Sequence, residues 1–271
     1  MTEYKQEIES RKDAIHAKKP LLHHISNYVT LSDCANITIA AGGVPIMGDA
    51  LDEVEEIARS AHALVLNLGT PNKQRVRAMI KAGKTARALE KPIIFDPVGV
   101  GVSTARMRWA EKIFTEVEPT IIKGNNGELA ALANLAGFHC GVDSLPGYQL
   151  PLEKLKELQK TLNAVVVATG ATDRVIAKGE CISVLHGDLY STRITGAGCM
   201  LNSVIALFAA VGDAPGAAVC GLAVFGKAAE DAASKMEGPF QPGTYKARFF
   251  DEMALKMHTR ATGEWKIQIL E

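Results

Sequence analysis

Four short apolar runs, separated by longer segments with helical spacing, constrain the fold of this chain more than any other feature of its sequence. Each run is continuously apolar, as strands are when both of their faces are buried in a parallel sheet. The runs cover residues 63–67, 92–96, 120–123 and 164–169. Because they alternate with predicted helices, the pattern indicates an α/β fold with a mostly parallel central sheet and helices on both faces.

The remaining segments extend this pattern. Helix start signals lie at 52–55, which has the spacing of a capping box, and at Asn72. Two short β-like runs within 174–189 predict antiparallel strands at the edge of the sheet. From residue 195 to residue 260 the pattern is helical. Since no linker or repeat interrupts the sequence, we expect a single domain over 1–271.

Charge and composition exclude several classes of function. Thirty basic residues balance thirty acidic ones, so no overall field attracts nucleic acid or an anionic membrane. The longest apolar stretch, 200–211, is too short to span a bilayer, and the charged segment 1–12 lacks the apolar core of a signal peptide. The five cysteines are widely spaced and form no C-x-x-C pair, which favours a reducing cytoplasm. We therefore expect a cytoplasmic protein that binds neither nucleic acid nor membranes.

The predicted strands end in polar side chains. Asn67, Asp96, Lys123 and Thr169 each close one apolar run, and glycine or proline follows each within two residues. In open α/β sheets, ligands bind outside the carboxyl ends of the strands. The sequence therefore predicts that these four junctions line one cleft.

A glycine-rich segment is the sharpest local signal. Thr195-Gly196-Ala197-Gly198-Cys199 follows the β-like region and precedes an apolar helix predicted to start near Met200. Glycines let backbone N–H groups approach a ligand closely, and the amino end of a helix carries partial positive charge. The segment therefore predicts an anion-binding loop. A glycine turn that only caps the helix is the alternative.

Two acidic residues at predicted strand ends are candidate ligands for Mg²⁺. Asp96 and Glu128 are expected in the same cleft, and Mg²⁺ favours one or two carboxylates together with substrate phosphates. Alternatively, Asp96 is a turn residue before Pro97, and Glu128 is an acid favoured in the first turn of a helix. Lys123 and the Thr169 hydroxyl could contact nucleotide phosphates from neighbouring strand ends. Alternatively, Lys123 is a solvated charge and Thr169-Gly170 is an ordinary turn at the end of a strand.

The glycine loop resembles the anion-hole signature of the ribokinase-like superfamily, in which aspartate usually holds the last position. This sequence has Cys199 there, and that departure resembles the hydroxyethylthiazole kinase family in particular. Further segments resemble the same family in order and spacing. They are 20–27, the Ala35-Asn36 pair, 44–47, 66–70, 96–101 and 123–128.

The resemblance implies a ribokinase-like three-layer α/β/α fold and a kinase that uses MgATP to phosphorylate the primary hydroxyl of 4-methyl-5-(2-hydroxyethyl)thiazole, in thiamine biosynthesis or salvage. It implies catalysis by Gly196, Ala197, Gly198 and Cys199. The thiazole would contact Asn27, Met47 and Gly196. ATP would contact Lys123, Asn125, Thr169 and Gly170, and Mg²⁺ would lie between Asp96 and Glu128.

Three positions depart from the family pattern. Lys123 stands where arginine is frequent, which keeps the charge but removes the bidentate fork. Tyr28 stands where a second asparagine is usual, and Asp49 follows Gly48 where uncharged residues are expected. These departures concern the ATP side and the thiazole side of the predicted site.

Cys199 could act in two ways. A helix N-terminus lowers the pKa of a thiol, so we expect partial thiolate character. The sulfur would then accept the proton late in the reaction, or it would only position the alcohol. The resemblance also implies a homotrimer in which Asn27 and Met47 meet Gly196 and Cys199 across an interface, an arrangement that symmetry permits.

Other functions remain open at this point. They are a ribokinase-like kinase of a different alcohol, such as a pyrimidine or a sugar, an ATP-dependent lyase on the same fold, and a ligand-binding protein without turnover.

Overall fold

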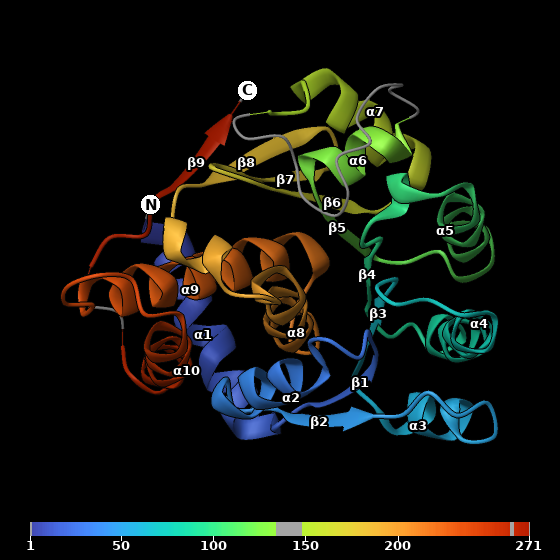
Figure 1. Cartoon of the computed structure of the whole chain (residues 1–271), viewed down its shortest axis with the longest axis horizontal. Helices are drawn as coiled ribbons and strands as arrows, with labels where there is room; N and C mark the ends of the chain where they lie inside the picture. Colours follow the sequence, from blue (N-terminus) through green and yellow to red (C-terminus); the bar gives the residue numbers. More distant parts are fainter. Residues whose placement is uncertain (1, 134–147, 261–262, 271) are drawn as a thin grey trace.

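The computed structural model describes residues 2–133, 148–260 and 263–270, and its described strands form one nine-stranded sheet (Figure 1). The strand order is β2-β1-β3-β4-β5-β6-β7-β8-β9. The strands are β1 (Leu21–Ile25), β2 (Val44–Met47), β3 (Ala63–Asn67), β4 (Ile93–Asp96), β5 (Ile121–Asn125), β6 (Val165–Thr169), β7 (Asp173–Ala177), β8 (Glu180–Val184) and β9 (Ile267–Leu270). Neighbours from β2 to β6 pair in parallel, and those from β6 to β9 are antiparallel.

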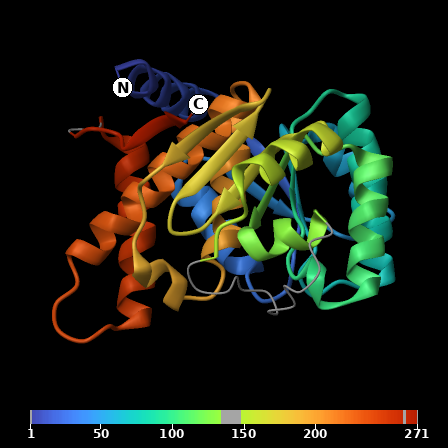
Figure 2. The same ribbon diagram turned by 90° about the horizontal axis from the view of Figure 1, so that it is seen from above.

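Helices cover both faces of the sheet (Figures 1 and 2). One layer contains α1 (Thr2–Lys18), α2 (Leu31–Ala40), α8 (Ala197–Ala209), α9 (Ala214–Ser234) and α10 (Pro242–His258). The other contains α3 (Val54–Ser60), α4 (Lys73–Ala88), α5 (Thr104–Val117), α6 (Asn126–Leu132) and α7 (Leu152–Leu162). Two short 3₁₀ helices, η1 (Val100–Val102) and η2 (Leu189–Arg193), lie in connections. The predicted three-layer α/β/α architecture is confirmed.

The four apolar runs form adjacent parallel strands, β3 to β6, as predicted. Every residue of β3 and β4 is buried, which explains why these strands show no alternation of apolar and polar residues. The antiparallel edge is also confirmed as β7 and β8. The sequence did not predict β9, which has four residues and extends this edge by pairing with β8.

The two predicted helix starts have different outcomes. Asn72 caps α4, since its side chain accepts a hydrogen bond from the Arg75 N–H. The capping box expected at 52–55 is wrong: α3 follows Glu53, whose side chain makes no capping bond. The backbone carbonyl of Ala50 accepts hydrogen bonds from the N–H groups of Glu53 and Val54 instead, so a turn replaces the side-chain cap.

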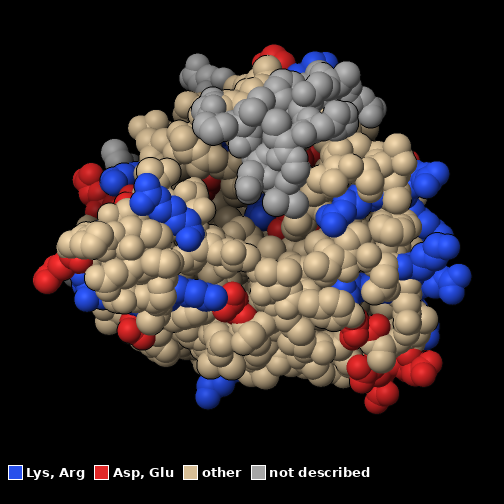
Figure 3. All heavy atoms as spheres, viewed as in Figure 1, with Lys and Arg blue, Asp and Glu red and all other residues tan. Residues whose placement is uncertain are grey.

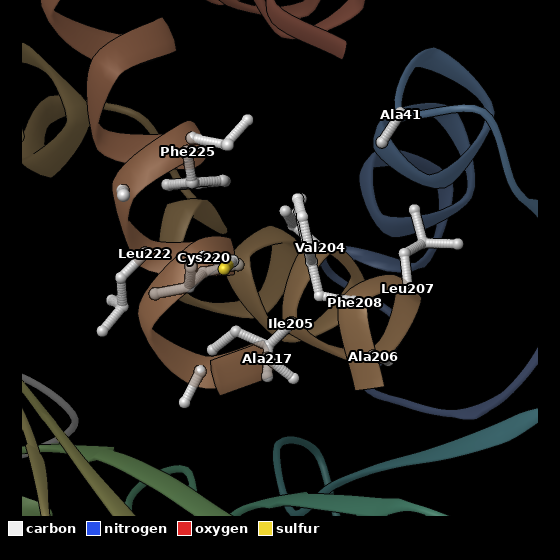
Figure 4. Packing of buried hydrophobic residues seen from close by; sticks show 14 of the residues in the cluster. Ala41, Val204, Ile205, Ala206, Leu207, Phe208, Ala217, Cys220, Leu222 and Phe225 are labelled. Atoms are coloured by element: carbon white, nitrogen blue, oxygen red, sulfur yellow. The ribbon is translucent and has the colours of Figure 1, made fainter. Parts of the chain in front are cut away.

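The apolar helix predicted over 200–211 is α8, and it packs against both the sheet and α9. Figure 4 shows Val204, Ile205 and Phe208 facing Cys220 in this contact. Gly221 allows the close approach, because a Cβ there would lie 3.0 Å from the Ile205 Cα. Within the part of the chain that the structure describes, no helix is long and apolar enough to cross a membrane.

His24 makes the stability of this core sensitive to acid. Its ring on β1 lies 3.0 Å from the Ser203 hydroxyl of α8, and burial lowers the pKa of His24 to about 4. The unfolded chain therefore binds the proton more tightly than the folded chain. The contribution of neutral His24 to the free energy of unfolding is fully present above about pH 6.5 and is lost as the pH falls toward 4.

We expect the free energy of unfolding to fall by about 3 kcal/mol through this group between pH 7 and pH 4. Urea unfolding across this range measures the change. His24→Asn should flatten the acid side of the plot of unfolding free energy against pH. Equal acid sensitivity in the His24 variant and the parent would contradict the assignment.

Candidate active site

The carboxyl ends of β3, β4 and β5 bring polar side chains together around Asp96. Asn67 and Asp96 are register partners on neighbouring strands. Asp96 Oδ2 accepts hydrogen bonds from Asn202 Nδ2 at 2.6 Å, Lys123 Nζ at 2.9 Å and Asn67 Nδ2 at 3.2 Å. Its second oxygen, Oδ1, is buried and has no hydrogen-bond partner among the described residues. The carboxylate is therefore held on one side and has an unused acceptor on the other.

Lys123 joins this carboxylate to the glycine loop. Lys123 is 3% exposed, and its ammonium also donates to the carbonyl oxygen of Gly198 at 3.0 Å. Burial opposes the charged form, but the negative charges of Asp96 and Glu128 outweigh it and raise the pKa of Lys123. A fixed positive charge thus lies directly against the loop.

The glycine loop turns into the first turn of α8. Gly196 is the N-cap residue with φ of +93°, and α8 begins at Ala197, earlier than the predicted start near Met200. A Cβ at Gly196 would lie 2.7 Å from Thr30 Cγ2, so any other residue there must displace Thr30, which precedes α2. The N–H groups of Ala197, Gly198 and Cys199 occupy the first helical turn, where such groups have no intrahelical partner. This geometry suits an anion.

Cys199 faces two amides. Its Sγ accepts hydrogen bonds from Asn67 Nδ2 at 3.3 Å and Asn27 Nδ2 at 3.4 Å, and the residue is partly exposed. The expectation of a lowered pKa is wrong: burial, reinforced by the negative charge of Asp96, raises the pKa of the Cys199 thiol. Desolvation of the thiolate is the largest cause of this rise in pKa.

Glu128 is the second candidate metal ligand. It forms a capping box with Asn125 at the start of α6, and its Oε1 accepts the Gly99 N–H at 2.9 Å. Burial and the nearby negative charge of Asp96 raise the pKa of Glu128 to about 7. The described residues contain no cluster of three or more metal-ligating side chains.

The donor set nevertheless fits Mg²⁺. This ion needs only one or two carboxylates when phosphates and water complete its shell. The unpaired Oδ1 of Asp96 is a free hard oxygen ligand, and a cation beside Glu128 would relieve the cost of burying two carboxylates near each other.

The predicted nucleotide residues lie together on β5 and β6. Asn125 and Thr169 are register partners, and the Thr169 hydroxyl donates to the Gly124 carbonyl at 3.4 Å. The Gly170 N–H donates to Asp173 Oδ1 at 2.9 Å. Figure 3 shows a hollow near the middle of the molecular face, with both basic and acidic side chains in it.

Comparison with known proteins decides the family. The model of the hydroxyethylthiazole kinase family matches residues 13–258. The chain belongs to this family. The hydroxyethylthiazole kinase of Thermoanaerobacter pseudethanolicus is 46% identical over 87% of this chain and 89% of its own length. The kinase of the same name from Methanosphaerula palustris is 38% identical over 97% of this chain and 99% of its own length.

Solved structures agree with the fold. The hydroxyethylthiazole kinase protein of Pyrococcus horikoshii superposes with a TM-score of 0.83 at 31% identity, covering 97% of this chain and 99% of that one. A ribokinase-like superfamily protein of Enterococcus faecalis, 13% identical, has a TM-score of 0.63 with coverage of 93% and 94%. The expected ribokinase-like fold and kinase class of this family member are therefore confirmed.

Two departures from the family pattern are coupled. The Tyr28 ring stacks on the guanidinium of Arg75, with 3.8 Å from Cζ to the ring centroid, and Arg75 Nε donates to Asp49 Oδ2 at 3.1 Å. Arg75 is almost fully buried. Tyr28 and Asp49 thus form one structural unit around a single arginine.

The subunit arrangement expected for the thiazole side needs one correction. Asn27 reaches Cys199 within a single chain, so the expectation that these two residues meet across an interface is wrong. The short connection from β1 to α2 and the position of α8 over β3 bring them together. Met47 ends the edge strand β2, half-buried, as the register partner of His24.

Two site residues were missing from the sequence-based prediction. Asn67 was recognised as a strand-end residue without a role, and Asn202 was not singled out within the apolar stretch 200–211. Both donate to Asp96 Oδ2. A fully buried amide within an apolar helix is the signal that could have identified Asn202, because such a group requires a polar partner.

Proposed function

We propose that this kinase transfers the γ-phosphoryl group of MgATP to the primary hydroxyl of 4-methyl-5-(2-hydroxyethyl)thiazole, in thiamine biosynthesis or salvage. The observation that carries the proposal is the contact of the glycine loop with Lys123, whose ammonium bonds both Gly198 O and Asp96. Phosphoryl transfer depends mainly on positioning and electrostatic stabilisation. A helix N-terminus with an adjacent buried cation provides both.

The residues of the site have separate roles in the reaction. The substrate hydroxyl attacks in line while the first N–H groups of α8 and the Lys123 ammonium stabilise charge on the transferred phosphoryl oxygens. Asp96 and Glu128 would hold Mg²⁺, which neutralises phosphate charge when bound. Asn125, Thr169 and Gly170 would contact ATP, and Asn27, Met47 and Gly196 the thiazole.

The raised pKa of Cys199 supports a positioning role for its thiol. Since two amides donate to the sulfur, its own proton can point toward the alcohol oxygen. A strong base is not required, because the transition state is loose: the bond from the γ-phosphorus to ADP breaks as the new O–P bond forms, and the hydroxyl proton passes late to an oxygen of the transferred phosphoryl group.

Incubation with MgATP and a panel of alcohols tests the proposal. The panel contains the hydroxyethylthiazole, a hydroxymethylpyrimidine and simple sugars, and ADP formation is followed. Preference for the thiazole supports the proposal. Turnover of another alcohol would replace the substrate, and no turnover would favour a lyase or a binding protein.

Cys199 variants give a second test. Cys199→Ala should lower kcat by about tenfold, less than the ~10²–10⁴ that a general base contributes. Cys199→Asp should keep or raise kcat, because its carboxylate still accepts the two amide bonds and adds a base. Steady-state kinetics measure both. An inactive but folded Asp variant that still binds ATP would contradict this role.

The same proposal includes a single kinase domain over 1–271, a cytoplasmic location and a homotrimer. The cytoplasm is supported by the four described cysteines, all of which are free thiols. The trimer is supported by exposed apolar side chains on and beside α2 and at the start of β2. They are Tyr28, Val29, Ile39 and Val44. Light scattering coupled to size exclusion tests the oligomeric state.

A further inference from the structure

The Asn67 side chain connects the Asp96 carboxylate to the Cys199 sulfur, two groups that no other described side chain bonds at once. Its Nδ2 donates to Asp96 Oδ2 at 3.2 Å and to Cys199 Sγ at 3.3 Å. Its Oδ1 accepts from Asn27 Nδ2 at 3.0 Å and from the Gly69 N–H at 2.9 Å. A carboxamide has two N–H donors and two oxygen lone pairs, so all four are used.

The orientation of this amide is fixed by its neighbours. Rotation by 180° would turn its oxygen toward the Asp96 carboxylate and its NH₂ group toward the donors of Asn27 and Gly69. Asn67 is 1% exposed, so water cannot compensate for such a loss. A Cβ at Gly69 would lie 2.8 Å from Asn27 Cβ, which shows how closely the turn after β3 encloses the amide.

We propose that Asn67 is a positioning residue that holds the Cys199 sulfur and the Asp96 carboxylate in one fixed geometry. It thereby couples the acceptor-alcohol side of the site to the side that would hold Mg²⁺. The naming of these two sides rests on the proposed function, whereas the coupling itself rests on the hydrogen bonds.

Two neighbouring amides make matched controls, because each contacts only one of the two groups. Asn27 donates to Cys199 Sγ at 3.4 Å, and its other side-chain bonds go to Asn67 and Thr30. Asn202 donates to Asp96 Oδ2 at 2.6 Å. Within the described part of the chain, Asn67 alone donates to both. Alanine variants at the three positions therefore separate the sulfur contact from the carboxylate contact.

The first measurement is the alkylation rate of Cys199 by iodoacetamide at neutral pH, without ATP or alcohol, read from the Cys199 peptide by mass spectrometry. N–H donors stabilise the thiolate, which is the reactive form. Asn67→Ala and Asn27→Ala should therefore slow alkylation by about threefold to tenfold. Asn202→Ala should leave the rate within about twofold of the parent.

The second measurement is the Mg²⁺ concentration that gives half of the thermal stabilisation by saturating ATP, again without alcohol. Loss of a donor to Oδ2 lets the Asp96 carboxylate move. Asn67→Ala and Asn202→Ala should raise this concentration by about threefold to tenfold, and Asn27→Ala should leave it within about twofold.

The proposal is supported if Asn67→Ala changes both the alkylation rate and the Mg²⁺ concentration, and each control variant changes only one of them. An Asn67 variant that shifts one quantity or neither overturns it. If Asn67→Ala does not fold, Asn67→Asp keeps the shape and places a carboxylate against the sulfur, so alkylation should slow at least as strongly. An unchanged rate in that variant overturns the sulfur contact. Since neither measurement needs turnover, failure of the thiazole assay would refute the proposed function separately.

Discussion

Gly196→Ala is expected to lower kcat by about 100-fold or more while the protein remains folded. Gly196 has φ of +93°, and an added Cβ would lie 2.7 Å from Thr30 Cγ2. The loop must therefore move away from Thr30, which shifts the first N–H groups of α8 from their positions. An N–H donor that has moved from its preorganised position stabilises the transition state much less. Steady-state kinetics with MgATP measure the loss.

Gly179→Ala is the matched control for this variant. Gly179 has φ of +84°, so alanine meets similar backbone strain, but nothing lies within 4 Å of the added Cβ. Both variants should lose about 1 kcal/mol of stability from the left-handed backbone. Only Gly196→Ala should lose activity. Similar kinetics in the two variants would contradict an anion-binding role for the loop.

Lys123→Met is expected to reduce the free energy of unfolding by about 3–5 kcal/mol, because it leaves a buried charge without its partner. Lys123 and Asp96 are 3% and 1% exposed, and Nζ lies 2.9 Å from Oδ2. Water cannot replace the lost cation at that depth. Urea unfolding at neutral pH measures the loss.

The double variant Asp96→Asn/Lys123→Met separates stability from catalysis. Removing both charges should restore most of the lost stability, since a buried ion pair contributes little compared with neutral groups of similar size. The double variant should have no kinase activity, because it lacks both the carboxylate and the cation. A double variant no more stable than Lys123→Met alone would refute this account of the pair.

Local sequence patterns predicted much of the fold. Continuous apolar runs identified β3 to β6, because a strand that is buried on both faces has apolar residues at successive positions. Such a run can be recognised within about five residues of sequence. The polar residues that end β3 and β4, together with Lys123 near the end of β5, do cluster around Asp96, because parallel strands present their carboxyl ends at one edge of the sheet. The four-residue strand β9 was missed because its pairing depends on β8, far away in the sequence.

Most residues of the candidate site were also identified from the sequence, but the hydrogen bonds between them were not. Asp96, Lys123, Glu128 and the glycine loop were all identified from motifs. No pattern indicated that Lys123 would bond both Asp96 and Gly198, since these residues are distant in sequence. Side-chain pairing of this kind depends on how α8 packs over the sheet.

Cys199 separates most clearly what sequence determined from what tertiary structure decided. The sequence by itself determined that a thiol stands at the amino end of an apolar helix, because the glycine loop and the helix are contiguous. Its pKa was decided by the tertiary structure: burial and the Asp96 carboxylate, brought from another strand, raise it. A helix dipole acts within one segment, whereas desolvation depends on every element packed around the sulfur.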